Sequence, residues 1–160
     1  MIPYFRSRYL GLTVFLSLSL LVCSGCKPSG QFHPAKGTVL VGGKPATGVV
    51  VTLVPEGDPK GSTPTASGKV SEDGAFSLNT YAADTRTVHK GARPGRYIVL
   101  LAWAPALTRE NLDQINPGTD LLAGRYSDPT TSPLRVEVAK GGAELPPIEL
   151  NASEVVVTRR

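Results

Sequence analysis

From residue 36 onward, the chain alternates short β-prone runs with turn residues. Two of these runs are apolar on both of their faces: residues 48–54 read Gly-Val-Val-Val-Thr-Leu-Val, and residues 96–103 read Arg-Tyr-Ile-Val-Leu-Leu-Ala-Trp. A strand that is apolar on both faces is typical of the interior of a sheet, whereas an edge or surface strand alternates with polar residues. The pattern therefore predicts two interior strands.

Shorter runs surround these two. Residues 38–41 precede the turn sequence Gly-Gly-Lys-Pro, and residues 66–71 and 75–79 flank Glu-Asp-Gly, a strong hairpin signal. Phe76 and Leu78 then share an inward face. Residues 134–138 alternate in polarity, and residues 148–150 and 154–158 are predicted as short closing strands.

Two polar connections separate the later strands, residues 81–93 and 104–133. The second is too long for a plain turn, and residues 108–115 are compatible with one or two helical turns. Seven or eight short strands with turns between them predict an all-β fold, an antiparallel Ig-like or prealbumin-like β-sandwich.

The first 25 residues have the order of a secretory signal peptide. Arg6 and Arg8 precede an apolar run at residues 10–22, and small residues follow it. This run is shorter than the roughly 20 residues that a membrane-spanning helix needs. A cleaved signal peptide at residues 1–25 is therefore expected, with a retained signal anchor as the alternative.

Both cysteines of the chain lie at the end of this leader, in Cys23-Ser-Gly-Cys26. A Cys-x-x-Cys pair can form a redox or zinc half-site, but such a site needs a folded setting and further ligands. The segment instead resembles a bacterial lipobox, in which Cys26 would take the lipid and Cys23 would leave with the leader. Cys23 stands where a lipobox usually has Leu. Residues 26–35 then form a lipidated tether, and residues 36–158 form the domain.

Charge adds little to this picture. The chain has 17 Lys and Arg against 13 Asp and Glu, and without Arg6 and Arg8 the balance is 15 against 13. The charges alternate in sign and form no basic cluster of the kind that binds nucleic acid. We therefore expect no nucleic-acid partner.

The order of several motifs resembles the carboxypeptidase regulatory-like, transthyretin-like domain. The motifs are Lys36-Gly-Thr-Val39, Gly43-Lys-Pro-Ala-Thr-Gly-Val49, Ser71-Glu-Asp-Gly-Ala-Phe-Ser-Leu78 and Pro94-Gly-Arg-Tyr-Ile-Val99. The segment from Tyr126 to Val138, taken with the lipobox, is similar to small secreted lipoproteins of planctomycete-type bacteria. The resemblance implies a prealbumin-like sandwich without a known enzymatic activity.

Few residues suggest chemistry. His33 is expected in the tether and His89 in a polar loop, and a metal site would need both together with a carboxylate such as Asp84. We predict solvated histidines, no metal and no cofactor. The chain lacks the paired histidines and the Tyr-Arg-Gly-Ser end of transthyretin-like hydrolases, so a hydrolase is the least favoured function.

Four aromatic residues are candidates for a site or for the core. Tyr81, Trp103 and Tyr126 could form a stacking platform for a ligand, although Trp103 continues the face of Tyr97 and therefore favours core packing. Tyr97 follows Pro-Gly and is expected to anchor a corner through a backbone hydrogen bond.

The sequence thus predicts a lipid-anchored, non-catalytic domain of the bacterial cell envelope with a structural or adhesive role. A carbohydrate- or peptide-binding module is the alternative. The expected partners are a membrane, through lipid on Cys26, and an envelope glycan or protein. A Lys rather than an Asp follows Cys26, which favours the outer over the inner membrane.

Overall fold

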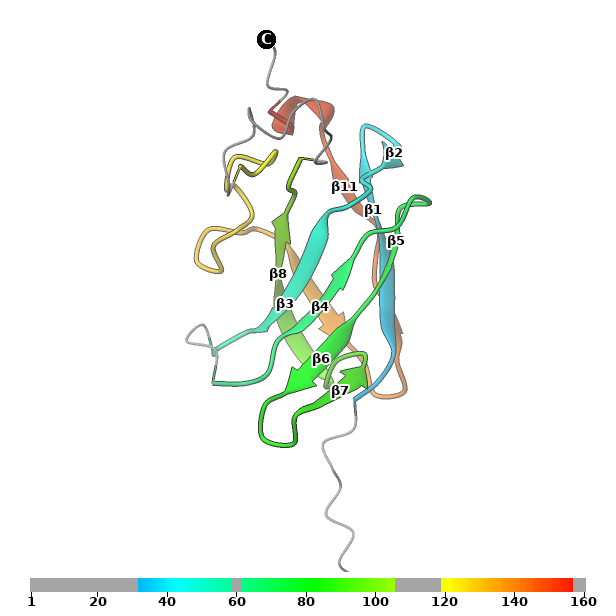
Figure 1. Cartoon of the computed structure of the whole chain (residues 1–160), viewed down its shortest axis with the longest axis vertical. Helices are drawn as coiled ribbons and strands as arrows, with labels where there is room; N and C mark the ends of the chain where they lie inside the picture. The colour runs from blue at the N-terminus through cyan, green and yellow to red at the C-terminus, as the bar shows by residue number, and fades with distance from the viewer. Residues whose placement is uncertain (1–31, 59–61, 106–118, 157–160) are drawn as a thin grey trace, which may run out of the picture.

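The computed structural model describes residues 32–58, 62–105 and 119–156 and shows an all-β chain with two sheets (Figure 1). The predicted all-β class is confirmed, but the described residues contain eleven short strands rather than seven or eight. The strands are β1 (Ala35–Val41), β2 (Lys44–Pro45), β3 (Val50–Pro55), β4 (Ala66–Lys69), β5 (Ala75–Ser77), β6 (Asn79–Ala82), β7 (Thr87–Lys90), β8 (Gly95–Ala102), β9 (Arg135–Val138), β10 (Ala143–Glu144) and β11 (Ile148–Leu150).

The larger sheet has six antiparallel strands in the order β7-β6-β4-β3-β8-β9. Its longest pairing joins β3 to β8, with Val50 opposite Ala102 and Pro55 opposite Tyr97. Both predicted interior strands are therefore confirmed. The inward residues Val51, Leu53 and Val99 are completely buried in the apolar core.

The smaller sheet is assembled around β1. Strands β2 and β5 pair with β1 antiparallel, whereas β10 and β11 pair with it in parallel. The prediction of a purely antiparallel fold is therefore wrong for this sheet. The parallel partners come from the far end of the chain, and a pairing between segments so distant leaves no local pattern in the sequence.

One continuous segment changes sheets. The predicted turn is present, with the Ser71 N–H donating to the Ala75 carbonyl oxygen at 2.8 Å, but the strand after it does not simply return along β4. Strand β5 pairs with β1, and β6, which follows after Leu78, pairs with β4. The Leu78 N–H donates to the Ala35 carbonyl oxygen at the crossing. Phe76 and Leu78 are both buried, as predicted.

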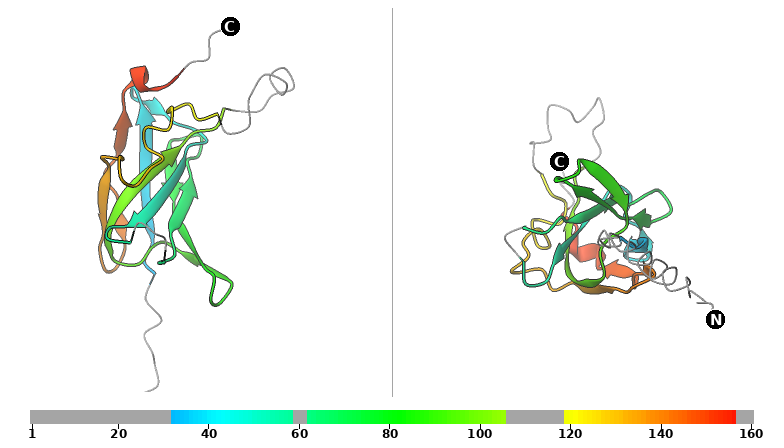
Figure 2. Two further views of the ribbon diagram at one scale, coloured as in Figure 1. Left: turned by 90° about the vertical axis from the view of Figure 1, so that its left-hand side faces the viewer. Right: turned by 90° about the horizontal axis from the view of Figure 1, so that it is seen from below.

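The two sheets enclose a common apolar core, an arrangement consistent with a β-sandwich (Figures 1 and 2). Both sheets and the connections between them contribute buried side chains. The largest fully buried ones are Leu53, Leu78, Leu101, Leu122, Val39, Val49, Val51, Val99, Val138 and Thr80.

The two connections predicted as polar loops are more ordered than expected. Residues 81–93 hold the end of β6, the whole of β7 and the Ala92 bridge to His33. In the second connection, residues 119–133 pack onto the core through Leu122 and Tyr126, and the predicted helical turns at 108–115 lie outside the described residues.

The two ends of the domain also differ from the prediction. At the start, β1 begins at Ala35 and His33 already bridges to Ala92, so the domain begins within the predicted tether. At the other end, residues 152–154 form a 3₁₀ helix (Ala152–Glu154), so the strand predicted over 154–158 is wrong within its described part. No helix among the described residues is long and apolar enough to cross a membrane.

Candidate functional site

The three aromatic residues predicted as a ligand platform do not come together. Tyr81 lies on β6 and Trp103 directly follows β8, and the register through β4 and β3 places them about five residues apart along the strand direction. At roughly 3.4 Å per residue this is about 17 Å, before the width of the intervening strands is added. One ligand cannot stack on both rings.

The three aromatic side chains differ in burial and in their hydrogen-bond partners. Trp103 is half-buried against the core, and its indole Nε1–H donates to the Thr47 carbonyl oxygen at 3.1 Å. Tyr126 is buried, and burial together with the neighbouring Glu154 raises the pKa of its hydroxyl. Only Tyr81 is well exposed, at 55%. The core packing predicted for Trp103 is confirmed, because its side chain lies against the apolar core.

The two histidines are held in the structure rather than free in loops. The Nδ1 of His33 accepts the N–H of Gly141 at 3.2 Å. His89 is half-buried on β7, where its ring stacks on Phe32 with the centroids 4.2 Å apart. Both settings contradict the prediction of solvated loop histidines. The described residues contain no group of three His, Cys, Asp or Glu side chains placed to hold a metal ion.

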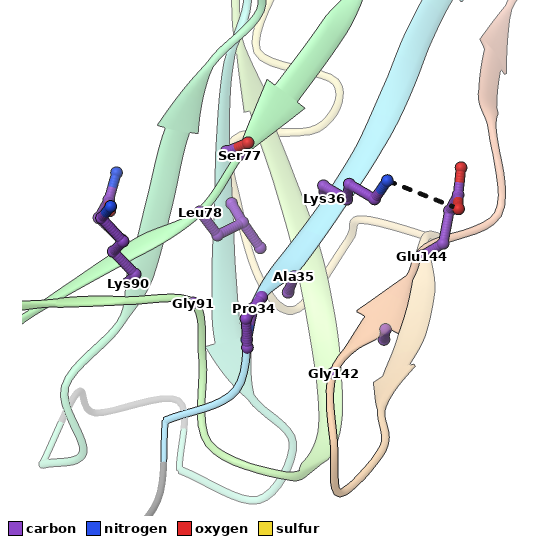
Figure 3. Close-up of a pocket in the computed structure, with 11 residues that line it drawn as sticks. Pro34, Ala35, Lys36, Ser77, Leu78, Lys90, Gly91, Gly142 and Glu144 are labelled. Atoms are coloured by element: carbon purple, nitrogen blue, oxygen red, sulfur yellow. Dashed lines mark ion pairs between the residues drawn. The ribbon is translucent and has the colours of Figure 1, made fainter.

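A cleft of about 540 Å³ opens beside the point where β1 begins (Figure 3). It is formed by segments that meet only in the fold: the start of β1, the crossing from β5 to β6, the end of β7, and β10. Its lining residues are Pro34, Ala35, Lys36, Ser77, Leu78, Asn79, Lys90, Gly91, Gly142, Ala143 and Glu144.

At one side of the cleft, the end of β7 and the segment before β1 approach each other closely. Gly91 has a φ of 91°, and a Cβ at this position would overlap the carbonyl group of His33. Ala35 and Leu78 form an apolar floor, and both are buried. Only glycine at position 91 allows β7 and the start of β1 to lie at this distance.

Charged side chains stand on the rim of the cleft. The Lys36 ammonium lies 3.8 Å from the Glu144 carboxylate, and both side chains are mostly exposed, so the pair adds little to stability. Lys90 stands on the opposite side (Figure 3). An apolar floor between separated charges suits a short peptide segment with an apolar side chain. None of the described residues that line the cleft is aromatic, whereas aromatic rings are the usual stacking surface for sugars.

Sequence reasoning missed the residue that organises the second connection. One carboxylate oxygen of Asp120 accepts the backbone N–H of Trp103 at 2.9 Å and of Leu122 at 3.1 Å, and the other accepts that of Gly124 at 2.9 Å. The local signal is Asp120 placed four residues before Gly124, a pairing compatible with a turn, and it does not identify the distant partner Trp103.

No family model, no curated protein and no solved structure matches this chain. The resemblance to carboxypeptidase regulatory-like domains stays a prediction from the motif order. The candidate site rests on the geometry of the cleft alone.

Proposed function

We propose that this protein is a lipid-anchored, non-catalytic β-sandwich of the bacterial cell envelope that has an adhesive or structural role. The lipobox-like segment at Cys26 supports the anchor, and its distance of six residues from Phe32 would keep the domain near the membrane. The motif order supports a carboxypeptidase regulatory-like, prealbumin-like domain. The outer membrane is the favoured location, because Lys27 follows the lipidated position.

The main support for a non-catalytic role is that the buried hydroxyl groups donate hydrogen bonds to backbone carbonyl oxygens. Thr80 donates its hydroxyl to the Gly91 carbonyl oxygen at 2.7 Å, and Ser132 donates to that of Val99 at 2.6 Å. Tyr97 donates to the Arg93 carbonyl oxygen at 2.8 Å, which confirms the predicted corner. Each of these hydroxyls donates to a backbone carbonyl rather than to a base, and this arrangement supports a structural role.

The adhesive part rests on the cleft between β1, β7 and β10. Its apolar floor and its rim of Lys36, Glu144 and Lys90 favour a segment of a partner protein over a glycan. The cleft also lies next to the point where the tether joins the domain, so a partner held there would be kept close to the membrane.

The anchor is tested by metabolic labelling with a fatty-acid analogue. Cys26→Ser should lose the label and accumulate as unprocessed precursor, whereas Cys23→Ser should keep both the label and normal processing. An unlabelled wild-type protein would contradict the lipid anchor. Label that persists in Cys26→Ser would place the lipid on another residue.

Adhesion is tested by site-specific photo-crosslinking in intact cells. A photoreactive side chain at Lys90 should capture a defined envelope protein, and one at the exposed Glu137 on β9 should not. Reversal of the rim charge by Glu144→Lys should weaken the capture at position 90. Equal capture at both positions would contradict a role for the cleft. Binding of the domain to a glycan array that survives Glu144→Lys would favour the carbohydrate alternative.

A further inference from the structure

The hairpin formed by β6 and β7 exposes apolar side chains. Tyr81 and Val88 lie directly opposite each other on neighbouring strands, and they are 55% and 67% exposed. The other large hydrophobic residues exposed in the described chain are Val50 and Val156, which lie elsewhere in the fold. A paired tyrosine and valine on one face is an apolar surface that has no partner within the described chain.

The same hairpin carries an excess of positive charge. Residues 79–93 contain Arg86, Lys90 and Arg93 against the single acid Asp84, and all four side chains are exposed. At the same end of the larger sheet, Glu56 is already paired with Arg96 at 3.1 Å. Tyrosine combined with lysine and arginine is the composition typical of surfaces that lie at the boundary between lipid and water.

The start of the domain is fastened to the base of this hairpin. The Phe32 ring stacks on His89, the Arg93 guanidinium lies 5.2 Å from the centre of the same ring, and His33 pairs with Ala92. These contacts determine where the tether leaves the domain. Figures 1 and 2 show the hairpin projecting beyond the start of β1 at this end of the molecule.

The reach of the tether matches the reach of the hairpin. Six residue steps from Cys26 to Phe32 cover at most about 20 Å. Arg86, near the tip of the hairpin, is three residues beyond His89, or about 10 Å further along the strand. A lipid on Cys26 would therefore hold the tip of the hairpin at or close to the bilayer surface.

We propose that the β6–β7 hairpin is a second membrane contact, which lays Tyr81 and Val88 against a leaflet that contains anionic lipid. This inference rests on the proposed lipid anchor and assigns the face of the domain that meets the membrane. Arg86, Lys90 and Arg93 supply the attraction to anionic headgroups, and the apolar pair enters the interface. One lipid anchor together with one such patch holds the domain in a fixed orientation, with the opposite end directed away from the bilayer.

The test uses the processed protein, purified with detergent from cells that make it, in phosphatidylcholine vesicles that contain phosphatidylglycerol and a phosphatidylcholine with brominated acyl chains. Tyr81→Trp places a fluorescent side chain on the proposed contact. Val50→Trp is the matched control, because Val50 is 40% exposed near the opposite end of the same sheet. Native Trp103 is present in both variants as a common background. We expect the bromolipid to cause a loss of the added emission in Tyr81→Trp and to leave that of Val50→Trp unchanged.

The other possible outcomes distinguish a failure of the hairpin contact from a failure of the lipid anchor. If the protein floats with the vesicles but Tyr81→Trp is not quenched, the membrane contact is wrong and the anchor stands. If the protein does not float, the proposed anchor itself fails. Quenching that is equal in the two variants would show that the domain has no preferred orientation, which also overturns the inference.

Charge is tested in the Tyr81→Trp background. Arg86→Glu combined with Lys90→Glu should abolish the quenching in vesicles that contain phosphatidylglycerol. Lys44→Glu combined with Lys69→Glu makes the same change in net charge at exposed positions remote from the hairpin tip and should leave it intact. If both pairs of substitutions have the same effect, attraction of the hairpin to anionic lipid is excluded.

Discussion

The two sheets of this domain are built in different ways. In the six-stranded sheet each strand pairs antiparallel with its neighbours, and the longest pairing, between β3 and β8, is six residues long. The smaller sheet depends on a single strand, β1, which collects four short partners of two or three residues each, two antiparallel and two parallel. The first sheet is a chain of antiparallel ladders of two to six residue pairs, and the second depends on the position of one strand.

This difference suggests where each sheet is vulnerable. Fully buried β-branched and leucine side chains stabilise the larger sheet, so its weak points are its core positions. The smaller sheet is joined to it through close backbone approaches at Gly91 and Gly68, where a Cβ would overlap the carbonyl groups of His33 and Ser77. Its weak points are therefore glycines and turns.

The largest effect is expected on the buried face of β8 in the larger sheet. Val99→Asp places an unpaired carboxylate at a fully buried position on β8 and should lower the free energy of unfolding by about 3–5 kcal/mol. Ala102→Asp is the matched control, because Ala102 is an exposed residue of the same strand, and it should change stability by no more than about 0.5 kcal/mol. Urea unfolding measures both. Similar midpoints for the two variants would mean that the inner and outer faces of β8 are assigned incorrectly.

The next effect concerns the junction between the sheets. Gly91→Ala and Gly57→Ala both place alanine at a φ of 91°, which costs about 1–2 kcal/mol. At position 57 nothing lies within 4 Å of the new Cβ, whereas at position 91 it overlaps the His33 carbonyl. Gly91→Ala should therefore destabilise the domain clearly more than Gly57→Ala in thermal unfolding. If the two losses are equal, the close approach at Gly91 is not a structural requirement.

A smaller effect is expected at the corner that leads into β8. Tyr97→Phe removes the hydrogen bond to the Arg93 carbonyl oxygen and should cost about 0.5–1.5 kcal/mol at neutral pH. Tyr81→Phe, at an exposed position, should cost nothing measurable. Urea unfolding at neutral pH compares the two variants. Equal losses of stability would show that the Tyr97 hydrogen bond does not stabilise the start of β8.

The same corner gives a pH dependence. Burial raises the pKa of the Tyr97 hydroxyl above its ordinary value of 10.0. The unfolded chain therefore ionises first, so the stability linked to this group is present below about pH 10 and is lost as the pH rises above it. The deficit of Tyr97→Phe should shrink above pH 10 in melting experiments. A deficit that grows with pH would contradict the buried setting of Tyr97.

The smallest effect is expected at the turn that leads into β5. The Ser71 hydroxyl at 2.6 Å and the Ala75 N–H at 3.0 Å both donate to the Asp73 carboxylate, and they hold its pKa below the ordinary 3.8. The stability linked to Asp73 is therefore present above about pH 3.8 and is lost as the pH falls through its lowered pKa. Asp73→Asn should show a small deficit in thermal melts at neutral pH that fades at low pH. Glu72→Gln, in the same exposed turn, should show none.

Several parts of the domain were determined by local sequence. The doubly apolar runs at 48–54 and 96–103 predicted β3 and β8, because consecutive apolar residues are typical of strands with a neighbour on each edge. Asp73-Gly74 predicted the turn before β5, where Gly74 has a φ of 85° that glycine adopts without strain. Tyr97, which follows Pro-Gly, predicted the corner. In each of these cases the residues that decide the structure are neighbours in the chain.

Other parts were decided only by the tertiary structure. Tyr126 was predicted as one member of a possible stacking platform, but it is buried against the core and beside Glu154, 28 positions further along the chain. The parallel pairing of β1 with β10 and β11 likewise left no local signal, since it depends on which edge of β1 remains free after β2 and β5 have paired.

The cleft is the clearest case of this second kind. Its floor and rim come from four separate segments, and none of them carries a binding motif. Sequence pattern reports the side-chain period of one strand at a time, and it therefore identified β3 and β8 but missed short strands such as β7. The register between distant strands, and with it the cleft and the exposed hairpin, depends on how all the strands fit around one core, which only the folded chain decides.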